Sequence, residues 1–323
     1  TRSVNEDAII SGSVVATDVD SSDVLTYART TSESVAGLTF NTNGTYTFDA
    51  SSYDALAAGD TQTITVEYRA TDQAGASSVA NLVITITGTN DAPVINAITT
   101  TALNEQTDTT ALTTSIPVTF TDVDLIDTGH IASITNVVAS GITTGLALDQ
   151  TALRALVTPG TVTKTSGSSS GSINMGFSAP ATALDYLAAG EVLTLTYTVG
   201  LNDGDGGITP QTFVVNITGT NDTPTITTVT GTDVTGAVIE DAHSTTLTNT
   251  GTITFDDVDL TNAHTVSVVK ASGTLGGTLA LGSVSESATT TAGSVPWTYS
   301  VANSATQYLA AGQTASEIAV VTI

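Results

Sequence analysis

The sequence contains no cysteine and only 6 basic residues. Without cysteine the chain cannot form disulfide bridges, so small domains must gain stability in another way. Asp and Glu number 31, which gives a formal net charge of −25 at pH 7. A charge of this sign repels nucleic-acid phosphates and anionic lipid headgroups. We therefore expect neither a nucleic-acid partner nor direct insertion into a membrane.

Long apolar segments and targeting signals are also lacking. There is no run of about 18 apolar residues, the length that a transmembrane helix needs. The N-terminus lacks the basic and apolar regions of a signal peptide. The chain begins only a few residues before a motif that recurs inside it. We therefore expect a segment of a longer protein, so the missing signal does not argue against secretion.

Aromatic residues make up only 5% of the chain, whereas Thr, Ser, Gly, Ala and Val are abundant. Abundant β-branched residues favour strands, and few aromatics suit several thin β-sandwiches better than one large core. A length of 323 residues is enough for two or three domains. We find no nucleophile motif, phosphate-binding glycine loop or His-Glu hydrolase spacing, so the sequence does not predict an enzyme.

A hexapeptide recurs and organises the rest of the chain, as Gly-Thr-Asn-Asp-Ala-Pro at 88–93 and Gly-Thr-Asn-Asp-Thr-Pro at 219–224. Each copy follows a segment that alternates apolar and polar residues, which is typical of a half-buried strand. The Gly ends the strand, the Asn-Asp pair supplies side-chain oxygens, and the Pro removes a backbone donor. We interpret these copies as stiff, acidic linkers and name them the first joint (88–93) and the second joint (219–224).

Three further landmarks recur in one order and divide the chain. The interval from Leu-Ala-Ala-Gly to the joint is the same in both complete repeats, from 56 to 88 and from 187 to 219. The interval before Leu-Ala-Ala-Gly varies, which confines insertions to one region of each repeat. This pattern predicts three tandem units: unit one (1–90), unit two (91–221) and unit three (222–323). The landmarks are acidic residues at 5–7, 104–105 and 240–241, Asp-Val-Asp at 18–20, 122–124 and 257–259, and Leu-Ala-Ala-Gly at 56–59, 187–190 and 309–312.

Short strands separated by turn signals predict an all-β fold of tandem Greek-key β-sandwiches. Asn43-Gly44 lies between two apolar segments and predicts a tight hairpin. The chain ends inside the unit-three strand that corresponds to 61–70, so that sandwich is expected to be incomplete. Either a continuing chain or a strand from a neighbouring chain would complete it. The strands expected in unit one are 9–15, 24–30, 37–41, 45–48, 61–70 and 78–87.

Unit two carries most of the extra length. Residues 148–157 predict a short helix, and the Ser- and Gly-rich stretch 165–172 predicts a flexible loop. That loop is either a contact surface or a plainly tolerated insertion.

Carboxylates from separate landmarks meet at each joint if the units stack end to end. Two carboxylates about 4 Å apart repel by roughly 4 kcal/mol at the effective dielectric of a protein surface. Basic residues are too scarce to neutralise them. Clustered oxygen donors suit Ca²⁺, with its about 6–8 ligands, better than Mg²⁺ or a transition metal. The alternative is that Asp-x-Asp and Asn-Asp only form turns, but four landmarks recurring in one order favour calcium.

The landmarks also resemble a known family. Asn5-Glu6-Asp7, Asp18-Val19-Asp20, Ala70-Thr71-Asp72 and Thr89-Asn90-Asp91 look like the calcium-binding signatures of cadherin-type repeats. Together with Leu-Ala-Ala-Gly and Gly-Thr-Asn-Asp-x-Pro, these motifs are similar to the bacterial VCBS and cadherin-like repeats of large secreted RTX-type adhesins, although no clear Leu-Asp-Arg-Glu motif is found. The resemblance implies cadherin- or Ig-like sandwiches, Ca²⁺ at the joints and an extracellular extender at the bacterial surface. Carried over by position, the implied ligands are Glu6, Asn90, Asp91, Asp122, Asp124 and Asp203 at the first joint, and Glu105, Asn221, Asp222, Asp257 and Asp259 at the second.

Weaker signals in the sequence indicate two alternative functions, a filament subunit and a carbohydrate-binding module. The incomplete unit three suggests a filament or sheath subunit that pairs with neighbouring repeats of an adjacent chain by strand complementation. Trp297 and Tyr299 could stack on cell-surface glycans as a carbohydrate-binding module, although a core position in a strand fits them better. His130 and His264 follow Asp-Val-Asp at similar places. We interpret both as ordinary surface or strand residues rather than as supports of the metal site.

Overall fold

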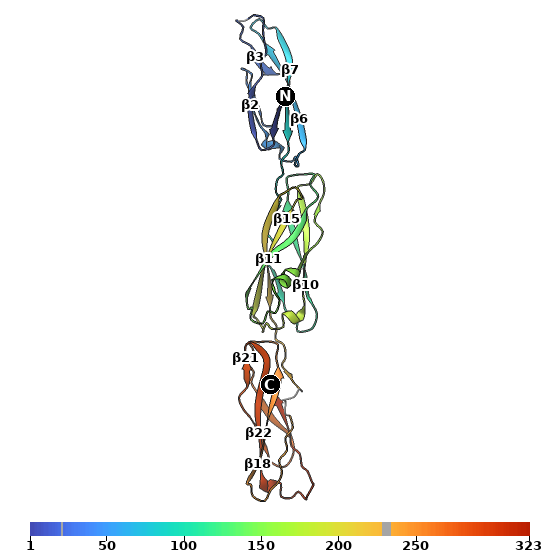
Figure 1. Ribbon diagram of the computed structural model, residues 1–323, viewed down its shortest axis with the longest axis vertical. Coiled ribbons are helices and arrows are strands. Elements are labelled where there is room, and N and C mark those ends of the chain that lie inside the picture. The colour runs from blue at the N-terminus through green and yellow to red at the C-terminus, as the bar shows by residue number, and fades with distance from the viewer. Residues whose placement is uncertain (21, 228–233) are drawn as a thin grey trace.

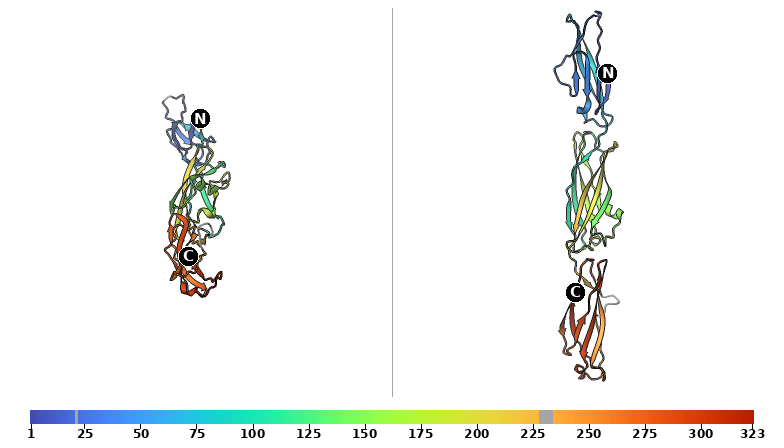
Figure 2. Two further views of the ribbon diagram at one scale, coloured as in Figure 1. Left: turned by 60° about the horizontal axis from the view of Figure 1, so that its bottom comes forward. Right: turned by 90° about the vertical axis from the view of Figure 1, so that its left-hand side faces the viewer.

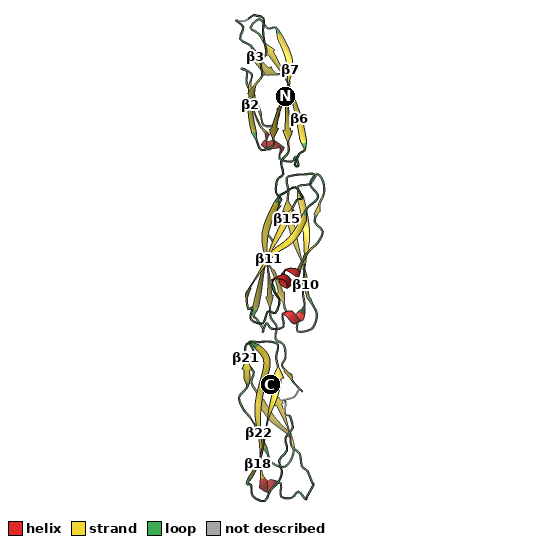
Figure 3. Cartoon of the chain, viewed as in Figure 1, coloured by secondary structure: helices red, strands yellow, loops and turns green. Residues whose placement is uncertain are grey.

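The structure is a computed structural model and describes residues 1–20, 22–227 and 234–323. It is an elongated rod in which three β-rich bodies follow one another along the long axis (Figures 1 and 2). Helices are limited to short turns between strands (Figure 3). Each body contains two sheets, and the strands of each body fall within the range of one predicted unit. The predicted all-β fold of tandem sandwiches is confirmed.

Unit one packs a four-stranded sheet on a three-stranded sheet. In order, the strands are β1 (Arg2–Asn5), β7 (Ser77–Thr87), β6 (Thr61–Thr71) and β3 (Thr26–Arg29), facing β2 (Ile9–Ser13), β5 (Thr45–Asp49) and β4 (Leu38–Phe40). The chain crosses repeatedly between the sheets, as in a Greek key. Alternate residues of β5 and β7, such as Phe48 and Ile84, fill the space between them. The six predicted strands are present, and the predicted hairpin joins β4 to β5 with Gly44 at a φ of 83°.

Unit two contains the largest core, in which Tyr197, Phe120 and Phe177 are almost completely buried. Its aromatic and aliphatic side chains alternate with outward polar residues along long paired strands, as period-two patterning requires. The first sheet contains β12 (Val157–Pro159), β14 (Ser170–Ala179), β10 (Leu112–Thr121) and β8 (Val94–Ile95), with β13 (Thr163–Lys164) also paired to β14. The second contains β11 (Ile131–Gly141), β15 (Val192–Asn202), β16 (Ile208–Thr218) and β9 (Thr101–Asn104).

The inserted segment of unit two is part of the sandwich. The predicted helix is present as α1 (Gln150–Ala155), which Asp149 caps by accepting a hydrogen bond from the Ala152 N–H. The prediction of a flexible loop over all of 165–172 is wrong, because its last three residues belong to β14. Gly171 lies against the Phe120 ring, where a Cβ atom would come within 2.1 Å of the ring. Glycine there serves close packing, although in the sequence it suggests a linker.

Unit three has a five-stranded and a two-stranded sheet among its described residues. Trp297 is 6% exposed and so lies in the core, which fits its interpretation as a strand residue better than as a sugar-stacking platform. The first sheet is formed by β17 (Thr225–Ile226), β18 (Thr246–Asp256), β22 (Thr290–Ala302) and β20 (Thr278–Leu281), with β21 (Ser285–Ser287) on β22. The second is formed by β19 (Ser267–Ser272) and β23 (Ile318–Thr322).

Two recurring features sit at the ends of the units. A 3₁₀ turn precedes each Leu-Ala-Ala-Gly. The three turns are η1 (Ala50–Tyr53), η2 (Ala181–Ala183) and η3 (Asn303–Ala305). In addition, a strand near the start of units one and two runs parallel to the last strand of the same unit: β1 pairs with β7, and β9, which follows β8, pairs with β16. The chain therefore enters units one and two at one end and leaves them at the other.

Candidate metal centres at the joints

Each joint is fastened to the Leu-Ala-Ala-Gly turn of the unit before it. The Gly88 N–H donates to the Asp60 carbonyl at 2.8 Å, and the Gly59 N–H donates to the Gly88 carbonyl at 3.1 Å. The second joint repeats both bonds around Gly219. A Cβ on Gly88 would lie 2.3 Å from the Ala57 carbonyl oxygen, so only glycine fits. These contacts explain why the interval between turn and joint is constant.

Glu6 is brought to the first joint by the parallel pairing of β1 with β7. Its N–H donates to the Thr87 carbonyl, which continues the ladder by one residue. Its side chain is fully buried, and Oε1 accepts hydrogen bonds from the N–H and hydroxyl of Thr89 at 2.6 and 3.2 Å. The linker itself therefore orients the carboxylate of the unit before it.

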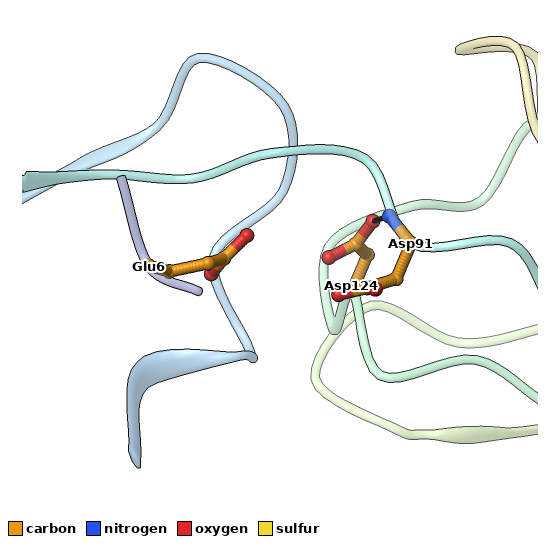
Figure 4. A group of neighbouring side chains, drawn as sticks. All are labelled: Glu6, Asp91 and Asp124. Carbon is orange, nitrogen blue, oxygen red and sulfur yellow. Dashed lines mark hydrogen bonds between the residues drawn. The ribbon is translucent and has the colours of Figure 1, made fainter. Parts of the chain in front are cut away.

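Asp122 and Asp124 reach the same joint from the following unit. The Asp91 N–H donates to Asp124 Oδ2 at 2.9 Å, and the Asp124 N–H donates to Asp122 Oδ1 at 3.0 Å. One oxygen each of Glu6, Asp91 and Asp124 lies within 4.8 Å of the others. Figure 4 shows Glu6 on one side and Asp91 with Asp124 on the other. Carboxylates of two units and their linker thus share one small volume.

Asn90 and Asp203 form the other side of the first joint. The Asn90 Nδ2 group donates to Asp203 Oδ2 at 3.0 Å. Asp203 Oδ1 accepts the N–H groups of residues 205, 206 and 207 at 2.9–3.1 Å. Burial raises the pKa of Asp203, but these hydrogen bonds outweigh it and the pKa is lowered overall. Asp203 is therefore held as a carboxylate that faces Asn90.

Several buried oxygens at the joints have no hydrogen-bond donor among the described residues. An unsatisfied buried polar atom costs about 1–3 kcal/mol, and more when the group is charged. So many in two equivalent places suggest that a cation compensates them. At the first joint they are Glu6 Oε2, Asn90 Oδ1, Asp124 Oδ1 and Asp127 Oδ2, and at the second Glu105 Oε1, Asp185 Oδ1, Asp222 Oδ2 and Asp259 Oδ1.

Burial and mutual repulsion raise the pKa values of carboxyls at both joints. Burial raises the pKa of Asp124 to about 7, with further increases from the charges of Asp127, Asp122 and Asp91. The Asp91 N–H opposes this shift but does not cancel it. At the second joint, burial and neighbouring carboxylates raise the pKa of Asp259 to about 6. Hard, crowded and electron-rich oxygens of this kind fit a divalent cation such as Ca²⁺.

The second joint repeats the arrangement of the first. Glu105 is 2% exposed and accepts the Thr220 N–H at 3.1 Å, as Glu6 accepts that of Thr89. The Asp222 N–H donates to Asp259 Oδ2 at 2.9 Å, and the Asp259 N–H donates to Asp257 Oδ1 at 2.9 Å. Asn221 instead donates to the Asp222 carbonyl at 2.7 Å and is exposed. Its side chain does not make the bond to a carboxylate that Asn90 makes.

Sequence reasoning missed three carboxylates that the structure brings to the joints. Asp185 is partly buried. Burial raises its pKa, and the charge of Asp222 raises it further. Asp54 occupies the same place in unit one, and its charge adds to burial and Asp7 in raising the pKa of Asp91. Both lie two residues before Leu-Ala-Ala-Gly, so the recurrence could have revealed them. Asp127, three residues after Asp124, is 8% exposed and has an unpaired Oδ2.

The two histidines also differ from their interpretation as ordinary residues. His130 is 6% exposed and packs on the Phe120 ring, with its Nε2 2.6 Å from Asp122 Oδ2. His264 places its Nε2 2.8 Å from Asp257 Oδ2 and packs on Phe255. Each therefore holds one oxygen of the first Asp in Asp-Val-Asp, while the other oxygen accepts a backbone N–H. The matching position after Asp-Val-Asp was the available signal.

A similar cluster lies at the far end of unit one. One oxygen each of Asp18, Asp23 and Asp72 lies within 4.8 Å of the others. These residues correspond by position to Asp122, Asp127 and Asp203 of unit two. Their side chains are more exposed than those at the first joint.

Residues 1–85 match the family model of a bacterial Ig domain. Among solved structures, the protocadherin gammaB7 EC3-6 cis-dimer is 15% identical with a TM-score of 0.43, over 84% of this chain and 57% of that chain. Human CDH23 EC21-23 is 16% identical with a TM-score of 0.43, over 91% of this chain and 86% of that chain. Comparison with curated proteins finds no match.

The bacterial Ig match spans almost all of unit one, including its strands from β1 to most of β7. It agrees with the sandwich architecture and with the resemblance to bacterial Ig- and cadherin-like repeats. No helix in the described parts of the chain is long and apolar enough to cross a membrane.

The raised carboxyl pKa values predict how stability depends on pH without divalent cations. The folded pKa of Asp124, about 7, lies above its ordinary value of 3.8, so folding favours the protonated form. That contribution is fully present below the ordinary value and is lost as the pH rises through the folded value. We expect the free energy of unfolding in chelator to fall between about pH 4 and about pH 7. Urea unfolding across this range tests it, and a rise with pH would contradict it.

Proposed function

We propose that the chain is a calcium-braced extender, a structural segment whose units are held in line by Ca²⁺ at the two joints. The observation that carries the proposal is the set of buried oxygens that have no donor among the described residues, which both neighbouring units and the linker contribute. Glu6 belongs to unit one, Asn90 to the joint and Asp124 to unit two. A cation that binds all three would fix the angle between the units. Carboxylate and amide oxygens suit Ca²⁺ in particular.

The residues of the first joint have distinct tasks in this mechanism. Glu6, Asn90, Asp91, Asp122, Asp124 and Asp203 would hold the cation there, and Glu105, Asn221, Asp222, Asp257 and Asp259 at the second joint. Thr89 and the Asp91 N–H orient the carboxylates of the two units toward the linker. Bound Ca²⁺ would supply the positive charge that these carboxylates lack. Its removal would restore their repulsion and free the linker to bend.

We further propose an extracellular setting, as part of a bacterial surface adhesin in which neighbouring repeats are the direct partners. Extracellular modules bind Ca²⁺ with Kd values of about 10⁻⁴–10⁻³ M, so millimolar external calcium fills such sites and cytosolic calcium does not. The similarity of residues 1–85 to a bacterial Ig domain supports this setting. The net charge of −25 fits a solvated, cation-dependent surface.

The decisive experiment is small-angle scattering of the chain in millimolar Ca²⁺ and in excess chelator. We expect a rigid, rod-like profile with calcium and a shorter, more variable one without it. Thermal unfolding under the same conditions should show a loss of stability. Calcium about 100-fold above its Kd adds roughly 2.7 kcal/mol for each site that binds only the folded state.

Two controls sharpen this experiment. Millimolar Mg²⁺ should restore less of the rod-like profile than Ca²⁺, because the crowded oxygens suit a larger and more flexible coordination shell. Raising the ionic strength with NaCl tests whether simple screening is enough. Identical scattering and melting curves in calcium and chelator would overturn the proposal.

A further inference from the structure

The inserted segment of unit two reaches into the first joint through Lys164. Its Nζ group donates to the Asp124 carbonyl at 2.6 Å and to the Asp127 carbonyl at 2.8 Å. Both acceptors belong to the loop 122–127 that carries the Asp-Val-Asp carboxylates. Lys164 is 9% exposed, which is rare for a lysine. An ammonium buried this far is stable only if it is paired, and here two backbone oxygens pair it.

Backbone hydrogen bonds extend the same contact. The Asp122 N–H donates to the Ser169 carbonyl at 2.8 Å, and the Gly167 N–H donates to the Leu125 carbonyl at 2.7 Å. Together with Lys164, these bonds attach the segment 164–169 to the loop 122–127 along its whole length. The segment therefore acts as a brace beneath the carboxylates.

The ammonium binds the loop through its carbonyls and leaves the carboxylate oxygens available. Asp124 Oδ1 and Asp127 Oδ2 both remain without a donor among the described residues. Burial and the charge of Asp205 raise the pKa of Asp127 overall, and the positive charge of Lys164 opposes this rise. Lys164 thus offsets part of the repulsion within the loop without occupying the ligand positions.

Unit three has a different side chain at the same place. Gly171 lies beneath the Phe120 ring, and Gly293 lies beneath the Phe255 ring. Both phenylalanines stand two residues before Asp-Val-Asp, so the two glycines occupy equivalent positions in units two and three. Lys164 is paired with Gly171, whereas the strand beside Gly293 carries Glu286. Glu286 accepts the N–H of His264 at 3.0 Å rather than binding the loop 257–262 directly. In addition, unit three has Asn262 at the position that Asp127 occupies in unit two.

We propose that Lys164 is a positioning residue that keeps the carboxylate loop of the first joint folded when no calcium is bound. The loop at the second joint has no such lysine and depends more strongly on the cation. Calcium removal would then loosen the second joint first and leave the first joint partly ordered. This inference rests on the proposed calcium function and specifies how that site is regulated.

Hydrogen exchange of the whole chain tests the inference at matched amides. The Asp122 N–H donates to the carbonyl of Ser169, just before β14, and the Asp257 N–H donates to that of Thr291 in β22. The N–H groups of Asp124 and Asp259 each donate to the side chain of the Asp two residues before. In excess chelator, we expect the amides of 122–127 to exchange about tenfold more slowly than those of 257–262. In millimolar Ca²⁺ the two loops should be similarly protected. Faster or equal exchange of 122–127 in chelator would overturn the inference.

Lys164→Met separates positioning from general stabilisation. We expect exchange of 122–127 to accelerate about tenfold in chelator, with a much smaller change in Ca²⁺. The same acceleration in both conditions would mean a merely structural role and would overturn the inference. Lys270→Met is the control, because Lys270 forms a partly exposed ion pair with Glu317 in unit three. If Lys164→Met fails to fold, the matched-amide comparison in the parent chain still decides.

The same measurements separate the two proposals. If calcium changes the protection of neither loop in the parent chain, the calcium function itself fails. If calcium protects both loops but chelator exposes them equally, only the role of Lys164 fails.

Discussion

Replacing Asp124 by Asn is expected to stabilise the chain in chelator and destabilise it in calcium. Asp124 is fully buried, and burial raises its pKa to about 7. Its Oδ1 has no donor in the part of the chain that the structure describes. Without a cation, the neutral amide removes repulsion with Asp122, Asp127 and Asp91, while its oxygen can still accept the Asp91 N–H. With calcium, the variant lacks a charged ligand. We expect the free energy of unfolding to rise by about 2 kcal/mol in chelator and to fall by about 2 kcal/mol in calcium. Thermal unfolding in the two buffers measures both changes.

Glu67→Gln is the matched control for this substitution. Glu67 is exposed in the middle of β6 and far from either joint along its strand. Removing its charge should change stability little in either buffer. If Asp124→Asn lowered the melting temperature equally in calcium and in chelator, Asp124 would serve the fold alone and the calcium site would need another set of ligands.

Replacing Gly219 by Ala is expected to destabilise unit two in both buffers. A Cβ there would lie 2.2 Å from the Leu187 carbonyl oxygen and 2.4 Å from that of Ala188. Both are backbone atoms, so the joint or the turn must move, at a cost of about 1–3 kcal/mol or more. Leu187 is completely buried, and a shift of its backbone would disturb the core as well. Urea unfolding with and without calcium measures the loss.

Gly176→Ala provides the comparison for Gly219→Ala. Gly176 lies in β14, and its nearest neighbour to an added Cβ is the Thr158 carbonyl oxygen at an ordinary 3.7 Å. This change should be nearly neutral. A neutral result for Gly219→Ala too would show that the joint tolerates a wider spacing, and the constant interval in the sequence would then need another cause.

The architecture was predictable because its signals are local and periodic. Alternating apolar residues mark β6, β7, β15 and β16, and the Asn-Gly pair marks the hairpin in unit one. The constant interval between Leu-Ala-Ala-Gly and the joint has a direct structural cause, since Gly88 and Gly219 are bonded to those turns. Repetition also predicts that residues far apart in the sequence, such as Glu6 and Asp124, lie at one joint, and their carboxylate oxygens do lie within 4.8 Å of each other.

The parts that escaped prediction lack such signals. Lys164 is one basic residue in an insertion without a complete counterpart, and its burial depends on where β13 meets the loop 122–127. Asp127 recurs as Asp23 but becomes Asn262 in unit three, which hides the pattern. His130 is buried because it fills space beside Phe120, and this packing depends on tertiary structure rather than on periodicity. Small residues at 170–172 suggested a loop, although they begin β14 and Gly171 packs beneath the Phe120 ring.

The parallel pairing of β1 with β7 and of β9 with β16 determines how units one and two would respond to a pulling force. In unit two, four consecutive residue pairs join β9 to β16, from Thr101 with Val215 to Asn104 with Thr218. Because the chain enters and leaves at opposite ends, tension along the rod slides these strands past each other. All hydrogen bonds between them are then loaded together, instead of opening one after another. An array built in this way transmits tension through its strands and resists stretching in the direction in which it extends.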